Sequence, residues 1–289
     1  MKDVITVGVD GTPEASAAVL WAAREAELRR ARLRLLHAWV LLAPEPVPGP
    51  AGEADQNYWA HRMVRDAHEA VRARHPDLPV DEALVSADPL AALKDAADRS
   101  DLLVLGSRDV GTMARYVLGE VGLQVVVHTD TPTVLVRARQ RPGAQAPDAP
   151  VMVGLSLHEP CEALLAFAFG SAARRGAVLR AVHGRHLPSY AYNRGGGVEP
   201  VAAEEAARDA RRELDAALGP WREKFPEVRV DARVEMQSPA QALLRDAGGV
   251  ALLAVGRRHK LRYPAPRIGH IVQAAVHHAP CPVAVVPHE

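Results

Sequence analysis

The chain has 289 residues, and its 35 basic and 35 acidic residues cancel, which argues against a whole-chain attraction to nucleic acid or to a membrane surface. The composition is 48% hydrophobic but only 4% aromatic, as expected for helices packed on a parallel sheet. No apolar run approaches the roughly 20 residues that span a bilayer, and the N-terminus MKDVITVGVDG lacks the apolar core of a signal peptide. Cys161 and Cys281 have no metal-like spacing. We therefore expect a cytoplasmic protein with reduced cysteines.

Apolar strands alternate with amphipathic helices through the first half of the chain. Residues 4–9 predict a buried strand, and either Asp10 or Thr12 can cap the helix that follows it to about residue 30. Four prolines exclude a helix over residues 42–52. The other expected elements are a strand over 33–39, a helix over 55–74, a strand over 80–86, a helix over 89–99, a strand over 102–105 that stops at Gly106, a helix that ends near 127, and a strand over 134–136.

The same pattern returns in the second half. Residues 151–155 match the first strand, and 178–183 match 32–37, both at an offset of 146. The offset then becomes 150 and pairs Pro89 with Pro239, Leu93 with Leu243, Gly106 with Gly256, Gly119 with Gly269, and Pro132 with Pro282. The extra residues therefore fall between the second and third strands, where insertion is tolerated best. We predict a duplicated domain over 1–138 and 151–289, joined by a polar linker over 139–150 that is rich in Pro, Gly and Ala.

Five strands alternating with four helices predict an α/β fold in each half, an open parallel sheet with right-handed crossovers and helices on both faces. In such a sheet, ligands bind beside the carboxyl ends of the strands where the strand order reverses. The expected pocket of each half is therefore the mouth beside its first and fourth strands.

Several segments carry a family resemblance. VGVDGTP, LRLLHAW, DLLVLGSR and TPTVLVR in the first half, with ALLAVGRR and CPVAVVP in the second, resemble the universal stress protein family in tandem. The resemblance implies two Rossmann-like (HUP-type) doubly wound domains, each an open five-stranded parallel sheet with helices on both faces. It also implies a stress-response role and pairing of domains through their last strands. We expect this pairing within one chain, as an intramolecular pseudo-dimer, and a homodimer of the chain is an alternative.

Nucleotide-binding members of that family have an aspartate after the first strand and a loop G-x2-G-x9-G-S/T after the fourth. Glycines let backbone N–H groups approach phosphates, and the next helix N-terminus favours an anion. The resemblance assigns these first-half residues to the pocket: Asp10, Gly11, Thr12, Ala38, Gly106, Arg108 and Gly119.

Two motif positions of the first half depart from this pattern. Asp109 replaces the second glycine and Glu120 the hydroxyl residue. A carboxylate ~4 Å from a phosphate charge costs ~1 kcal/mol in water and about 4 kcal/mol at an effective dielectric of about 20. A magnesium ion that bridges a carboxylate and a phosphate would soften this repulsion.

The second half departs differently. Its pocket equivalents are Ser156, Gly256, Arg258 and Gly269. Ser156 replaces the acidic residue, while His259 and His270 take the other two motif positions. The run from Arg257 to Arg267 is basic, and a solvent-exposed surface is its simplest interpretation. Neither half has a complete nucleotide motif.

Structural roles are alternatives for the same residues. Asp10 fits a helix cap as well as a nucleoside contact, and Gly106 and Gly119 fit turns and close packing as well as a ligand loop. His37 and His183 occupy equivalent strand ends and are expected to be structural. The histidines near the C-terminus lack metal-ligand spacing, and we expect no metal site.

Three functional hypotheses follow. The favoured one is a non-enzymatic stress-response protein with degenerate nucleotide pockets that acts by binding a protein partner of unknown identity. The alternative is a sensor of ATP or another adenine nucleotide that uses the first-half pocket through Asp10. The third is a nucleotide hydrolase, for which the sequence offers no Ser/His/Asp or Cys/His arrangement. ATP is thus the one candidate cofactor, and no catalytic residue is assigned.

Overall fold

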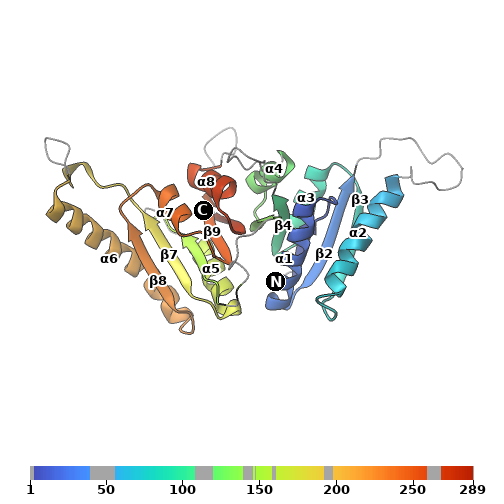
Figure 1. Ribbon diagram of the computed structural model, residues 1–289, viewed down its shortest axis with the longest axis horizontal. Coiled ribbons are helices and arrows are strands. Elements are labelled where there is room, and N and C mark those ends of the chain that lie inside the picture. The colour runs from blue at the N-terminus through green and yellow to red at the C-terminus, as the bar shows by residue number, and fades with distance from the viewer. Residues whose placement is uncertain are drawn as a thin grey trace, which may run out of the picture. The chain divides into compact units, whose positions relative to one another are not determined.

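The computed structural model describes residues 3–39, 56–107, 120–138, 146, 148–157, 161–191, 198–258 and 268–288. The chain divides into two compact units, residues 1–139 and 140–289 (Figure 1). No helix in these described ranges is long and apolar enough to cross a membrane.

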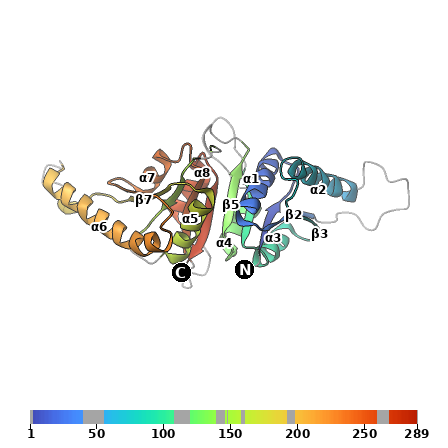
Figure 2. The ribbon, with the colours of Figure 1, turned by 90° about the horizontal axis from the view of Figure 1, so that it is seen from below.

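The first unit is an open parallel sheet with the strand order β3-β2-β1-β4-β5. Helices α1 and α2 pack together on one face, and α3 and α4 pack together on the other (Figure 2). In chain order the elements are β1 (Val4–Gly8), α1 (Pro13–Arg29), β2 (Arg32–Trp39), α2 (Gln56–Arg72), β3 (Val80–Ser86), α3 (Pro89–Asp98), β4 (Leu102–Ser107), α4 (Glu120–His128) and β5 (Thr133–Arg137).

The second unit repeats this arrangement with the order β10-β9-β6-β7-β8, again parallel. A single-turn 3-10 helix, Ser189–Ala191, is added after the second strand of the unit. The elements are β6 (Val151–Gly154), α5 (Glu162–Arg175), β7 (Leu179–Gly184), α6 (Pro200–Lys224), β8 (Val230–Glu235), α7 (Pro239–Arg245), β9 (Leu252–Arg258), α8 (His270–His278) and β10 (Val283–His288). The predicted α/β class and parallel sheets are confirmed.

Strand registers reproduce both offsets of the sequence repeat. Ile5 lies beside Leu33, and Val151 lies beside Leu179, which is an offset of 146 for both partners. The third strands keep the offset of 150, because Leu33 pairs with Val80 and Leu179 pairs with Val230. The extra residues of the second unit therefore lie between β7 and β8, where α6 has 25 residues and α2 of the first unit has 17.

The core consists of the central strands and the helix faces that cover them. Strands β1, β4, β6 and β9 are mainly apolar because helices bury both of their faces, and β1 contains one buried polar residue, Thr6. The strand expected over 102–105 continues through Gly106 to Ser107, since both residues remain paired with β5. The glycine interrupts the apolar run of the sequence without ending the ladder.

Candidate functional site

The corner after β1 of the first unit is a capped helix start. The Asp10 carboxylate accepts hydrogen bonds from the backbone N–H and the hydroxyl of Thr12, at 3.0 and 2.6 Å. The Thr12 hydroxyl oxygen accepts the N–H of Ala15 at 3.1 Å. Thr12 is therefore the N-cap of α1, and Asp10 orients it. Of the two residues predicted to cap, Thr12 does so directly, and the nucleoside contact of Asp10 stays a prediction.

Both described glycines of this corner have a structural reason. Gly11 has φ of +76°, which favours glycine, and a Cβ there would lie 2.7 Å from the Met63 sulfur. A Cβ on Gly106 would lie 2.7 Å from the backbone of α1, at Glu14 C and Ala15 N. Gly106 therefore lets the start of α1 pack on β4.

The remaining first-half site residues are only partly described. Ala38 is half-buried at the end of β2, opposite Val85 of β3. Arg108, Asp109 and Gly119 lie outside the described residues, as does His259 of the second half, and Glu120 is the first residue of α4. The predicted approach of two carboxylates to a phosphate therefore stays a prediction.

The two strand-end histidines make the same bond in both units. His37 Nδ1 lies 2.6 Å from the carbonyl oxygen of Val9, and His183 Nδ1 lies 2.9 Å from that of Leu155. Because a carbonyl oxygen only accepts, each Nδ1 carries a proton. The bonds tie the residue after the first strand of each unit to the second strand, which confirms the structural role expected for both rings.

A cavity of about 630 Å³ lies in the second unit at the carboxyl ends of β6 and β9. Strand β6 leads into α5 and β9 into α8, so the cavity occupies the point where the strand order reverses. All four second-half residues predicted for a pocket, Ser156, Gly256, Arg258 and Gly269, line it. The other lining residues are Gly154, Leu155, Cys161, Leu164, Val182, His183, Gly184, Pro239, Leu243, Val255, Arg257, Ile268, His270, Ile271, Val272 and His288.

The two motif glycines of this cavity differ in what surrounds them. A Cβ on Gly256 would meet the His288 ring, with Nε2 at 2.5 Å. Among the described residues, a Cβ on Gly269 would meet nothing within 4 Å, and its φ of −62° suits any residue. Gly269 is the N-cap of α8 and provides no side-chain cap. Its described surroundings therefore do not require a glycine, whereas an anion on the first-turn N–H groups would benefit from its absent side chain.

The described residues that line the cavity include arginines and histidines but no aspartate or glutamate. Arg257 is only 5% exposed, while Arg258 at the end of β9 is exposed. The prediction of a solvent-exposed basic run is therefore wrong for Arg257, because β9 extends through it and pairs with β10. Burial raises the pKa of the Cys161 thiol. The lining thus favours a negatively charged ligand over a cation.

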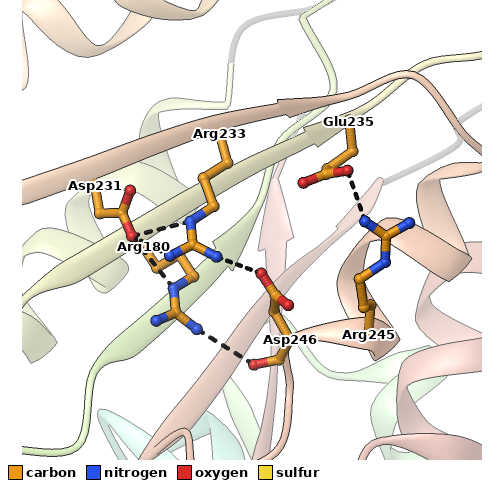
Figure 3. A network of polar contacts seen from close by, with 6 residues as sticks. All are labelled: Arg180, Asp231, Arg233, Glu235, Arg245 and Asp246. Carbon is orange, nitrogen blue, oxygen red and sulfur yellow. Dashed lines mark hydrogen bonds and ion pairs between the residues drawn. The ribbon is translucent and has the colours of Figure 1, made fainter.

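A separate polar network joins β7, β8 and α7, and its residues do not line the cavity (Figure 3). Arg180 and Arg233 both point to the Asp231 carboxylate, at 3.5 and 2.8 Å, and Arg233 also reaches Asp246 at 2.5 Å (Figure 3). The hydrogen bond from Arg233 lowers the pKa of Asp231 against the opposing effect of its partial burial. The same bond raises the pKa of Arg233. These contacts fasten the edge strand β8 to α7 and place charges along an edge that would otherwise attract another strand.

Cys161, Leu243 and His288 are among the cavity residues that sequence reasoning missed. Cys161 is the repeat equivalent of Ala15, and Leu243 is the equivalent of Leu93, which was noted only as a repeat position. The offset could have assigned both to the mouth of the sheet. His288 could not be found in this way, because its placement depends on β10 continuing to the end of its pairing with β9.

Neither cysteine forms a disulfide, and Cys281 is buried. Within the described part of the chain, no three His, Cys, Asp or Glu side chains come together in a way that could hold a metal ion.

Comparison with known proteins gives the family. The Universal stress protein family profile matches residues 1–137 and 149–287. A universal stress protein of Mycolicibacterium smegmatis is 30% identical over 293 residues, which cover 98% of this chain and 96% of the relative. A universal stress protein of Mycobacterium tuberculosis is also 30% identical, and the aligned residues cover 97% of this chain and 95% of that relative.

A solved structure has the same fold. The crystal structure of a universal stress protein from Archaeoglobus fulgidus superposes with a TM-score of 0.69 at 14% identity and covers 100% of both chains. The expected Rossmann-like fold is thus confirmed. The chain belongs to the universal stress protein family and carries two family domains in tandem.

Proposed function

We propose that this universal stress protein is non-enzymatic and binds an anionic small molecule in the cavity of its second unit, and that the bound state is recognised by a protein partner. The observation that carries the proposal is the cavity itself. Its described lining combines Arg257, Arg258 and the start of α8, and it contains no carboxylate. A volume of about 630 Å³ is in the ordinary range of small-molecule sites, about 300–1,000 Å³.

The same lining supports binding without catalysis. His183, His270 and His288 are the candidate bases. No aspartate or glutamate lies among the described lining residues to serve with them as a second acid or base. His183 uses Nδ1 to hold the Leu155 carbonyl. Burial also keeps the Cys161 thiol protonated and so a poor nucleophile.

The sequence favoured the first half for ATP, through Asp10. In the structure, the Asp10 carboxylate already accepts two hydrogen bonds from Thr12. Both bonds end on Oδ1, so Oδ2 is still able to accept a ribose hydroxyl. The nucleotide-sensor hypothesis stays the alternative, because two of its other motif residues, Arg108 and Gly119, lie outside the described residues.

Calorimetric titration of the full chain with inorganic phosphate, AMP and ATP tests the proposal. At least one of these anions, or a larger anion that carries the same group, is expected to bind. Arg258→Ala should weaken that binding by about 10-fold or more, since a charge-assisted hydrogen bond contributes about 1.5–3 kcal/mol. Arg212→Ala is the matched control, because Arg212 is 80% exposed on α6 and pairs there with Asp209. Equal binding by both variants, or turnover of ATP with magnesium, would contradict the proposal.

A further inference from the structure

The cavity has an apolar side as well as a basic one. Leu155 follows β6, Val182 lies in β7, and Leu243 comes from α7; all three line the cavity and are buried. The Leu243 methyl groups lie 2.8 Å from where a Cβ of Gly154 would be, so this side chain covers the end of β6. Leu164 of α5 and Val255 of β9 continue the apolar wall. The region beside β6 and β7 therefore favours apolar groups.

The same region has few groups that could hold a sugar. Ser156 stands where the first unit has Asp10, and Leu157 stands where it has Gly11. No carboxylate among the described lining residues could accept a pair of ribose hydroxyls. A buried hydroxyl without a partner loses its hydrogen bonds to water, which penalises a nucleoside here.

The basic side lies next to the apolar wall. Arg258 ends β9, and the uncapped start of α8 at Gly269 provides backbone N–H groups. Gly269 adds no side chain to fill this space. An anionic head group of a ligand would therefore contact β9 and α8, while its body would lie along β6, β7 and α7.

We infer that the ligand of this cavity is an amphipathic anion, a carboxylate or phosphate monoester on an apolar chain or ring, and not a nucleotide. The inference rests on the proposed function, of which it names the ligand class. A carboxylate and a phosphate monoester are both anions whose oxygens accept hydrogen bonds from arginine and backbone N–H groups. The experiment separates the two.

The test is calorimetric titration of the full chain with decanoate, decyl phosphate, AMP and ATP. Decanoate or decyl phosphate should bind at least ~10-fold more tightly than either nucleotide, a difference of about 1.4 kcal/mol. Whichever of the two binds more tightly identifies the head group. Arg258→Ala should weaken its binding by about 10-fold, and Arg212→Ala should leave it unchanged.

The Cys161 thiol locates the bound probe. Cys161 lines the cavity, whereas Cys281 is 1% exposed, so alkylation by iodoacetamide should modify Cys161 first. The reaction is run at about pH 9, because burial raises the pKa of this thiol. At saturation, decanoate or decyl phosphate should slow alkylation of Cys161 at least ~10-fold. At lower concentrations, the protection should follow the fraction of protein that has the probe bound.

Ser156 offers a matched pair of variants that tests the missing acidic group. Ser156→Asp places a carboxylate in the cavity and should weaken decanoate binding by about 10-fold through charge repulsion. Ser156→Ala should change the affinity for decanoate less than ~3-fold, since it adds no charge and Ser156 is only half-buried. Circular dichroism confirms that both variants fold.

The outcomes separate the inference from the function on which it rests. Tighter binding of AMP or ATP, with protection of Cys161, overturns the amphipathic ligand but retains the anion site. Decanoate binding that neither protects Cys161 nor responds to Arg258→Ala also overturns the inference, because the probe then binds elsewhere. If no anion binds, inorganic phosphate included, both are overturned.

Discussion

Replacing Gly106 by alanine tests whether the first motif glycine serves packing. The added Cβ would lie 2.7 Å from both Glu14 C and Ala15 N. Carbon contacts are normally about 3.5–4.0 Å, so the methyl group would overlap helix backbone. It cannot rotate away, since a Cβ has no torsion of its own, and α1 or β4 must shift instead.

We expect Gly106→Ala to destabilise the first unit by about 1–3 kcal/mol, the usual cost of overpacking. The transition of that unit should move down by about 2–4 °C for each kcal/mol in a unit of this size. Urea unfolding followed by circular dichroism, together with calorimetry, measures both quantities.

Two glycines of the second unit provide graded controls. Alanine at Gly256 meets the far end of the His288 ring, at 2.5 Å, and this side chain can rotate. The expected cost is below ~1 kcal/mol. Alanine at Gly269 meets none of the described residues within 4 Å, and its effect should stay within about 0.5 kcal/mol. Equal losses in the three variants, or an unchanged Gly106→Ala protein, would refute the steric argument.

Three further substitutions probe a cap, an ion pair and the aromatic core. Thr12→Ala removes the cap on Ala15 N and should cost about 1 kcal/mol in urea unfolding; no loss would mean that the cap is replaceable. Arg233 lowers the pKa of Asp231 in the folded protein. The ionised Asp231 therefore stabilises the fold above its unfolded-state pKa near ~3.9, and this stabilisation is lost as the pH falls through the lower folded-state pKa. The Asp231 side chain is 37% exposed, so the ion pair should contribute under ~1 kcal/mol to the free energy of unfolding. Asp231→Asn should therefore make the free energy of unfolding less dependent on pH between about pH 5 and 3. Phe169→Ala should cost about 3–5 kcal/mol, because this ring is fully buried against Trp221 at 5.9 Å; a loss below ~1 kcal/mol would contradict that packing.

The strands and helices and the repeat were predictable from the sequence because they depend on local patterns. A run such as Leu102–Leu105 is apolar on both faces, and only a strand covered on both sides buries it fully. The offsets were predictable because duplicated registers keep duplicated spacings, as the pairs Ile5–Leu33 and Val151–Leu179 show.

The cavity was not predictable to the same degree, because it depends on distances between elements. The motif named Ser156, Gly256, Arg258 and Gly269, and all four line it. The motif did not show that a side chain at Gly106 would overlap helix backbone while one at Gly269 would meet no described residue, since both are simply glycines in a sequence. The predicted domain boundaries and the pairing of the last strands stay predictions.

The two units keep the contacts that hold the mouth of the sheet and differ in the groups that would contact a ligand. The histidine bond to the residue after the first strand is made by His37 to Val9 and by His183 to Leu155. This bond fixes the backbone at one side of the mouth of the sheet in either unit.

The polar groups of the corner, in contrast, are not kept. The first unit has Asp10 and Thr12 hydrogen-bonded to each other at the corner, and elsewhere a buried pair at 2.7 Å between Thr6 of β1 and Ser100, which precedes β4. The second unit has Ser156 at the corner, and Met152 and Val250 at the positions of that pair. The same backbone frame therefore surrounds an acidic, hydrogen-bonded corner in one unit and, in the other, a corner where Ser156 lies near arginines. Because ligand affinity depends on these side chains and fold stability depends on the frame, binding of different ligands by the two units requires no change of fold.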